Sequence, residues 1–172
     1  MSPEGNILMK KKLILIRHAH RDISDRGADN GLSEKGRAQA RALAEHFLAQ
    51  YDGKKAGSFR MLSSPRRRCV ETIQDIADEA HVKIELSRLL VEQEDGESAR
   101  DLETRVKEFL AWWRNEAPKF TLICSHGDWL PLALSFLIGG AVDFKKGAWA
   151  EVTLDEGSDE PKPQLKSLFQ PT

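Results

Sequence analysis

The chain has 172 residues, which is enough for one domain with a sizeable hydrophobic core, and its 40% apolar and 31% charged residues are ordinary for a globular protein. Lysine and arginine (26) nearly balance aspartate and glutamate (27), and the net charge of −1 excludes a general attraction to nucleic acid or to acidic membranes. Any anion-binding site must therefore be local. We expect one domain over residues 1–172, with residues 1–11 as a flexible N-terminus.

Cysteine content and the first segment bear on where the protein resides. Cys69 and Cys124 are too few for a disulfide framework and lack the spacing of metal ligands, which favours a reducing compartment. The segment MKKKLILI has the charged start of a signal peptide, but its apolar run lasts only four residues before Arg17. No stretch approaches the length of a membrane span. We therefore predict a cytoplasmic protein that is not associated with a membrane.

Short apolar runs alternate with helical patterns along the chain, which predicts βαβ units and a mostly parallel sheet. Ser33 has the position of a helix cap, and Pro65 has the first position of the next helix. Helices are predicted over 31–51, 65–80 and 99–117, and an apolar segment extends over 126–140. The predicted strands are 12–16, 58–64, 82–86 and 120–125.

Residues 147–170 follow a different pattern, with two strand-like runs around a polar turn that contains proline and glycine. We predict a C-terminal hairpin at the edge of the sheet. Within it, residues 155–163 are expected to form a flexible loop.

Polar clusters follow three of the predicted strands. In an open parallel sheet, ligands bind beyond the carboxyl ends of the strands, where helix N-termini also present free N–H groups. Arginines and histidines dominate the clusters, and their convergence suits an anion. Arg66 and Arg67 are expected to be solvated, because only one residue of a helical turn faces a site squarely. The cluster members are Arg17, His18, His20 and Arg21 after 12–16, Arg66, Arg67 and Arg68 after 58–64, and Ser125, His126 and Asp128 after 120–125.

A metal site is the alternative for the first cluster, because His18, His20 and Asp22 follow an H-x-H-x-D spacing that some metallohydrolases use. Arg17 and Arg21 flank these histidines with fixed positive charge, which would oppose a dication. No second histidine cluster completes a ligand set. We therefore expect no metal ion and no other cofactor.

Five motifs, in a fixed order, carry a resemblance to a known family. They are LIRHAHRD, GLSEKGRAQA, LSSPRRRCVETI, VEQEDGES and ICSHGDWL, and they extend from about Leu13 to Leu137. In this combination the sequence resembles the histidine phosphatase superfamily, in its phosphoglycerate-mutase-like branch. The resemblance implies an α/β fold, with a three-layer α/β/α sandwich around a mostly parallel sheet, and the activity of a phosphatase.

The resemblance also implies roles for residues of the three clusters. Arg17 and His18 stand at the arginine and the nucleophilic histidine of the R-H-G motif. Arg68 stands at the arginine of the S-S-P-x-x-R motif, and His126 at the second histidine. Neutral imidazole is nucleophilic near pH 7, so His18 can attack phosphorus. Arg17, Arg68 and a protonated His126 would bind the phosphoryl oxygens.

The acid of the reaction is assigned by spacing. Glu92 lies four residues before Gly96, as the family's proton-donating glutamate does before its glycine, and Glu94 is close enough to be a rival. In an extended segment both side chains point the same way, so either carboxylate can reach the leaving group. We expect the acid to have a raised pKa, because it must hold a proton until the leaving group departs. Asp128 and His20 are the next candidates.

Residues 19–21 depart from the family pattern or extend it. Ala19 replaces the glycine of R-H-G, which requires a backbone angle that alanine tolerates. His20 stands where many relatives carry an acidic or amide residue, and either shapes the substrate pocket or faces solvent. Arg21 resembles a second arginine of the acid-phosphatase branch, and is either a phosphate ligand or the ion-pair partner of Asp22 or Asp25.

Together these residues predict a metal-independent phosphomonoester hydrolase that acts through a phosphohistidine on His18. A phosphoglycerate-type mutase is the second hypothesis, but a mutase usually needs extra segments over its site, and the stretch from Ala80 to Ala99 is short. The third is a non-catalytic protein of the same fold that binds a phospholigand or a phosphoprotein. The expected partner is a phosphorylated small molecule or a phosphoprotein, and the sequence leaves the oligomeric state open.

Overall fold

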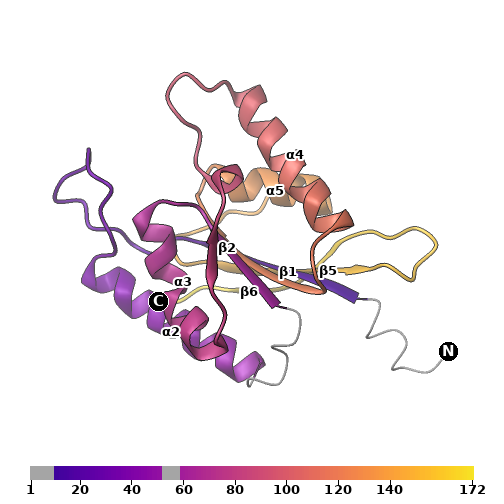
Figure 1. The fold of residues 1–172 in the computed structure, drawn as a ribbon, viewed down its shortest axis with the longest axis horizontal. Helices are drawn as coiled ribbons and strands as arrows, with labels where there is room; N and C mark the ends of the chain where they lie inside the picture. The colour runs from indigo at the N-terminus through magenta and orange to yellow at the C-terminus, as the bar shows by residue number, and fades with distance from the viewer. Residues whose placement is uncertain (1–9, 52–58) are drawn as a thin grey trace.

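In the computed structural model, which describes residues 10–51 and 59–172, one sheet of six strands crosses the molecule (Figure 1). The strands are β1 (Lys10–Arg17), β2 (Phe59–Ser63), β3 (Ile84–Leu86), β4 (Phe120–Ser125), β5 (Trp149–Asp155) and β6 (Gln164–Phe169). Their order across the sheet is β3-β2-β4-β1-β5-β6. The first four strands pair in parallel, whereas β5 is antiparallel to β1 and β6 is antiparallel to β5.

The central position of β1 follows from its composition. Residues 13–16 have no exposed surface, as a continuous apolar run requires when both faces of a strand are covered. Parallel pairing of β1 and β2 with β4 brings three carboxyl ends to one edge, where Arg17 pairs with Ser125 and Ser63 with Cys124. β5 runs in the opposite direction and begins at this same edge. The polar clusters therefore follow strands that end side by side.

Two helical layers cover the two faces of the sheet, as Figure 1 shows. α2 (Glu34–Gln50) and α3 (Arg67–Ala80) pack on one face, while α4 (Ala99–Asn115), α5 (Trp129–Ile138) and the short 3₁₀ helix η2 (Arg88–Leu90) pack on the other. No helix in the described residues combines the length and the hydropathy that crossing a membrane requires. The three-layer α/β fold is confirmed. The first core includes Phe47, Ile73 and Met61, and the second includes Phe109, Trp113 and Trp129.

Two elements begin later than the sequence predicts, because contacts from other segments fix their starts. The predicted helix start at Pro65 is wrong: α3 begins at Arg67, whose N–H donates to the carboxylate of Asp29 at 3.1 Å. The strand predicted from Val82 begins at Ile84, because the N–H of Val82 bonds to a carbonyl in the last turn of α3.

The flexible N-terminus predicted over residues 1–11 is wrong for Lys10 and Lys11, which belong to β1. Lys11 is buried, and its ammonium group donates to the carbonyls of Trp113 (2.9 Å) and Arg114 (3.0 Å) at the end of α4. A cation suits the C-terminal end of a helix, where carbonyls lack partners. Residues 1–9 lie outside the described part of the chain.

The predicted hairpin and the first helix cap are confirmed. β5 and β6 pair antiparallel, β6 forms the edge of the sheet, and residues 156–163 connect the two strands. The hydroxyl oxygen of Ser33 accepts from the N–H of Gly36 at 3.1 Å, which caps α2. Ser58, the first residue of the predicted second strand, lies outside the described residues.

Candidate active site

His18 is the first residue after β1, at the sheet edge where the polar clusters meet. Its backbone N–H donates to the carbonyl of Ser125 at 3.1 Å, which ties it to the end of β4. Its ring Nδ1 lies 2.8 Å from the carbonyl oxygen of Ala19, and a carbonyl oxygen can only accept. Nδ1 therefore carries the ring hydrogen, which leaves the lone pair of the neutral imidazole on Nε2.

Alanine is tolerated at position 19, as the sequence required. Among the described residues, His81 is the only residue other than glycine with a positive φ, so Ala19 has an ordinary backbone angle. Ala19 is fully buried, and its N–H donates to the hydroxyl oxygen of Thr72 at 2.9 Å. This bond holds the residue next to the nucleophile against α3.

Burial and positive neighbours keep His18 neutral. Burial is the main cause that lowers its pKa, and the charges of His126, Arg68 and Arg17 lower it further, to about 3. The hydrogen bond with Ala19 acts in the opposite direction and does not compensate. At pH 7 the imidazole is therefore unprotonated, which is the state that a nucleophile needs.

The guanidinium of Arg17, the last residue of β1, lies against the backbone of Gly127. A Cβ atom at position 127 would lie 2.6 Å from Cζ and 2.8 Å from Nη2 of Arg17. Only glycine leaves room for the guanidinium, which explains the glycine after His126. Burial lowers the pKa of Arg17, while Asp143 and Asp128 act to raise it.

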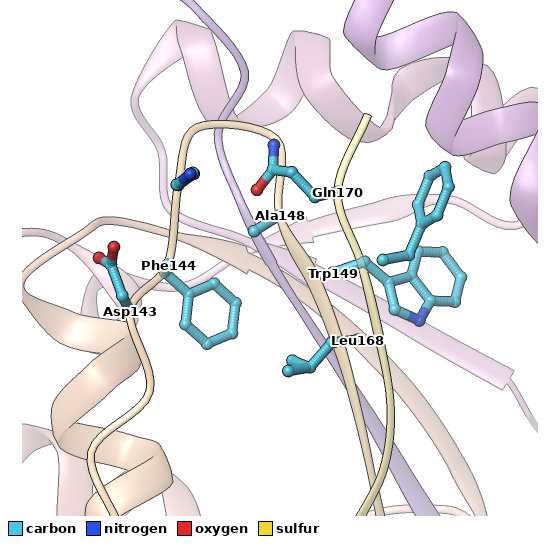
Figure 2. Close-up of a pocket in the computed structure, with 8 residues that line it drawn as sticks. Asp143, Phe144, Ala148, Trp149, Leu168 and Gln170 are labelled. Atoms are coloured by element: carbon cyan, nitrogen blue, oxygen red, sulfur yellow. The ribbon is translucent and has the colours of Figure 1, made fainter. Parts of the chain in front are cut away.

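Arg17 also holds the loop that precedes β5. Its Nη1 donates to the carbonyl of Phe144 at 2.5 Å, and the N–H of Gly147 donates to the Arg17 carbonyl at 3.2 Å. This loop and the end of β6 enclose a cavity of about 280 Å³, which Figure 2 shows with Phe144, Leu168 and Gln170 around it. The loop that Arg17 binds therefore also lines this cavity.

Arg68 and His126 meet beside His18. Arg68 lies in the first turn of α3, and its Nη2 is 3.3 Å from Nδ1 of His126. Because an arginine only donates, Nδ1 of His126 is an acceptor in this contact. The rings of His126 and His18 are edge to face, with 5.4 Å between their centroids. All three side chains are buried.

Two buried guanidinium nitrogens, Nε of Arg17 and Nε of Arg68, have no hydrogen-bond partner within the part of the chain that the structure describes. A buried donor without a partner costs about 1–3 kcal/mol, and more when it is charged. An oxyanion between the two arginines would satisfy both donors. The structure thus brings the predicted nucleophile His18 together with its predicted phosphate ligands.

The carboxylate of Glu92 reaches the same cluster from the loop before α4. Its Oε2 lies 2.8 Å from Nε2 of His126 and 3.4 Å from Nη2 of Arg68. Its Oε1 accepts from Nε of Arg66 at 2.8 Å. Arg66 therefore contacts the site, contrary to its expected place in solvent, whereas Arg67 is exposed and pairs with Glu71.

The charge state of Glu92 differs from the expectation. Burial raises its pKa, but the hydrogen bond with His126 and the charge of Arg68 outweigh burial and hold the pKa well below its ordinary value. The raised pKa expected of the acid is therefore wrong for this arrangement. Burial lowers the pKa of His126, but its contacts with Cys69 and Glu92 outweigh burial and raise it.

Glu94, the rival acid, lies at the rim. Its Oε1 accepts from Nη2 of Arg88 at 2.9 Å and lies 3.9 Å from Nη2 of Arg66. The side chain of Glu94 is 40% exposed, against 25% for Glu92. The structure therefore places Glu92 beside His126 and Glu94 toward solvent.

Comparison with known proteins bears on the family resemblance. Residues 13–94 match the sequence profile of the histidine phosphatase superfamily (branch 1). The resemblance predicted from the motifs is therefore confirmed over this part of the chain. No curated protein matches the sequence, whereas many solved structures match the fold.

Three solved structures are similar to this chain in fold. A protein assigned as an alpha-ribazole-5'-P phosphatase from Escherichia coli has a TM-score of 0.74 at 19% identity, over 93% of this chain and 96% of its own. A protein assigned as the phosphohistidine phosphatase SixA from Agrobacterium tumefaciens has a TM-score of 0.70 at 20% identity, over 94% and 97%. A mycobacterial glucosyl-3-phosphoglycerate phosphatase has a TM-score of 0.67 at 19% identity, over 91% and 97%.

The loop that carries Glu92 is held by Arg105 of α4, which no sequence motif indicated. Nη1 of Arg105 donates to the carbonyls of Leu89 (3.0 Å) and Val91 (2.9 Å), and Nη2 donates to that of Glu92 (3.2 Å). The carboxylate of Glu97 binds Nε at 2.6 Å and Nη2 at 2.7 Å. The only signal in the sequence is an arginine beside the apolar face of a predicted helix.

Two side chains, one at the end of β4 and one just after it, hold the same loop. Asp128 accepts from the N–H of Gln93 at 2.9 Å, and the hydroxyl of Ser125 donates to the carbonyl of Leu90 at 2.6 Å. Asp128, a further candidate for the acid and for the substrate pocket, thus contacts the backbone next to Glu92 rather than the histidines. In this geometry it positions the loop that carries Glu92.

His20 and Arg21 lie beside the cluster rather than within it. Nδ1 of His20 is 2.7 Å from the hydroxyl of Ser33, at the cap of α2. Nη2 of Arg21 donates to the carbonyl of Arg26 at 3.4 Å. Among the described residues, no three histidine, cysteine or acidic side chains are placed to hold a metal ion together, so the H-x-H-x-D spacing forms no ligand set.

The contact between Arg17 and Gly127 yields a testable prediction. Gly127→Ala should weaken the binding of inorganic phosphate by about 10-fold or more, because the added methyl group displaces the guanidinium. Isothermal titration calorimetry measures the affinity. Gly140→Ala is the control, since a Cβ there meets no atom within 4 Å. Equal phosphate affinity in Gly127→Ala and wild type would contradict this account of Arg17.

The lowered pKa of His18 predicts a loss of stability in acid. Between the ordinary pKa of 6.5 and about 3, the unfolded chain binds a proton at His18 that the folded chain does not. The free energy of unfolding therefore falls as the pH falls through this window. From pH 6.5 to pH 5 the loss amounts to about 2 kcal/mol. Urea denaturation at pH 7 and pH 5 should show a smaller loss in His18→Gln than in wild type.

The control for this prediction removes an exposed histidine. His81→Asn keeps a residue that tolerates the left-handed backbone at φ 55°. This variant should lose as much stability in acid as the wild type. If His18→Gln also loses as much, His18 is not held neutral in the folded protein.

Proposed function

We propose that the chain is a metal-independent phosphomonoester hydrolase that forms a phosphohistidine on His18. The observation that carries the proposal is a neutral imidazole under the charges of Arg17 and Arg68, whose buried Nε atoms have no partner among the described residues. A phosphoryl group at this point would offer three acceptor oxygens to those donors. The solved structures of similar fold are named as phosphatases, which supports the same class of reaction.

In the first step, Nε2 of His18 attacks phosphorus, and the bond from phosphorus to the ester oxygen breaks. The transition state of phosphoryl transfer is loose and spreads charge over the equatorial oxygens, so the site must supply fixed positive charge. Arg17 and Arg68 supply it, and His126 adds a hydrogen-bond donor. The arginines thus take the electrostatic role that metal ions have in many other phosphatases.

Glu92 gives the leaving group its proton, and the bound phosphoryl group makes this possible. Glu92 is ionised while Arg68 and His126 face it. A phosphoryl dianion bound by the same two groups offsets the positive charge of Arg68 and adds negative charge beside the carboxylate. Both effects raise the pKa of Glu92, so it can take up a proton and donate it to the departing alkoxide.

In the second step, a water molecule attacks phosphorus, and the ionised carboxylate of Glu92 accepts its proton. The bond between phosphorus and Nε2 of His18 breaks, and inorganic phosphate leaves. The imidazole returns to its neutral state, and Glu92 loses its proton to solvent as the phosphate departs. Each turnover therefore consumes one ester and one water.

A phosphorylated small molecule is the proposed substrate. The substrates named for the similar structures include a glucosyl phosphoglycerate and a phosphohistidine, and they apply to those proteins. The buried nucleophile and the loop held by Arg105 favour a compact phosphate ester at this site.

The intermediate provides the direct test. Wild type should release phosphate from p-nitrophenyl phosphate and, after an alkaline quench, carry a phosphoryl group on His18 that mass spectrometry locates and that acid removes. His18→Ala should do neither, with an unchanged circular dichroism spectrum. His81→Asn serves as the matched control and should behave as wild type.

Three outcomes would overturn the proposal. Phosphate release by His18→Ala at the wild-type rate would show that His18 is not the nucleophile. Transfer of the phosphoryl group to a second position of a phosphoglycerate, without release, would indicate a mutase. Binding of phosphate esters by wild type without turnover would indicate a phospholigand-binding protein.

The roles of Glu92 and Glu94 are separated by the leaving group. An alkoxide cannot depart without a proton, whereas a nitrophenolate nearly can. Glu92→Gln should therefore slow the hydrolysis of an alkyl phosphate by about 100-fold or more, and that of p-nitrophenyl phosphate much less. Glu94→Gln is the matched control and should leave both rates close to wild type. The reverse result would transfer the role of acid to Glu94.

A further inference from the structure

A second group of cations lies beside the phosphoryl site and has no role in the mechanism above. It consists of Arg21, Arg26, Lys35 and Lys146, and we call it the second cationic cluster. Its members come from two segments that are far apart in the sequence, the stretch from residue 20 to the first turn of α2 and the loop before β5.

The first segment folds back on itself next to His18. Arg21 pairs with Leu32 in an isolated antiparallel bridge. The N–H of Ser33 donates to the carbonyl of His20 at 3.0 Å, and the hydroxyl of Ser33 donates to the same carbonyl at 3.1 Å. These bonds place the first turn of α2, which includes Lys35, beside the residues that follow the nucleophile.

The second segment is bound to the nucleophile itself. The N–H of Gly147 bonds to the carbonyls of Arg17 (3.2 Å) and His18 (3.1 Å). The side-chain amide of Gln170 donates to the carbonyl of Lys146 at 3.1 Å. Lys146 is therefore held one residue away from a backbone contact with His18.

The charges of this cluster repel one another. Burial lowers the pKa of Lys146, and the next causes are the positive charges of Arg17, Arg21, Lys35 and Arg26. Lys146 and Lys35 also lower the pKa of His20, after burial. Within the described residues, no member of the cluster forms an ion pair, whereas Arg66 and Arg68 on the other side of the site pair with Glu92. An anion beside Lys146 would relieve this repulsion.

We propose that the second cationic cluster is a subsite for a second anionic group, a carboxylate or a phosphate, on the leaving group of the substrate. The inference rests on the proposed function and narrows its substrates to small phosphate esters that carry another negative charge. A small molecule is favoured over an acidic protein because Lys146 is bound through Gly147 to the backbone of His18, so the two anion sites adjoin.

The experiment compares matched substrates. Phosphate esters of two to four carbons that end in a carboxylate are each paired with the ester of the same length that ends in a hydroxymethyl group. Wild type should prefer the best carboxylate ester by about 10-fold or more in kcat/KM. Lys146→Gln and Lys35→Gln should reduce this preference, mainly through KM, and leave the hydroxymethyl esters within about 2-fold of wild type.

Lys145→Gln is the matched control. It removes one positive charge from the neighbouring exposed residue of the same loop. This variant should keep the preference of the wild type. Equal loss of the preference in all three variants would mean that the net positive charge of the region determines the preference for carboxylate esters. That result would overturn the subsite.

The remaining outcomes separate the subsite from the proposed function. Equal turnover of both series by wild type would overturn the subsite and keep the hydrolase. No turnover of either series would overturn the hydrolase. The subsite would then be tested by calorimetry, by comparing the affinity of wild type and Lys146→Gln for the same esters. A preference for acidic phosphopeptides over every carboxylate ester, lost in Lys146→Gln, would assign the cluster to a protein partner and overturn the small-molecule proposal.

Discussion

The crowding of positive charge at one edge of the sheet is the constraint on which the site depends. Parallel pairing with β4 brings the ends of β1 and β2 together, and with them Arg17 and the first turn of α3. Burial lowers the pKa of His18 and the neighbouring cations lower it further, while contacts with His126 and Arg68 keep Glu92 ionised. The hydrophobic layers on both faces hold the strands in place against this repulsion. The charge of each group is therefore a property of the whole cluster.

The fold and the centre of the site could be predicted because both rest on local patterns. Apolar runs and helical faces are visible in the sequence, and they fix a mostly parallel sheet with helices on its two sides. Arg17, His18 and His126 follow directly on such runs. In a parallel sheet, residues that follow the strands meet at one edge whatever the details of the connections. Ser33 was recognisable as a helix cap for the same reason, because the cap and the N–H group of Gly36 that it binds lie within four residues of sequence.

The remaining features depend on contacts between distant segments. Arg105 binds backbone carbonyls, which every residue has, so no residue type marks its partners. The lowered pKa of Glu92 is set by His126 and Arg68, which approach it only in the folded chain. Lys146 is 128 residues from His18 along the chain. Its neighbour Gly147 nevertheless donates a backbone hydrogen bond to the carbonyl of His18. Spacing in the sequence can suggest the residue types of a site, but the charge states and the supports come from the tertiary structure.

The hydrogen bonds of Arg105 to the loop make α4 and Glu92 a single mechanical unit. Phe109 and Trp113 anchor this helix in the core, well away from the reacting atoms. A core substitution that tilts α4 would carry Glu92 with it and change its reach toward the leaving group. For the hydrolase proposed above, evolutionary drift at buried apolar positions can therefore alter which esters are preferred, while every residue in contact with the phosphoryl group stays the same.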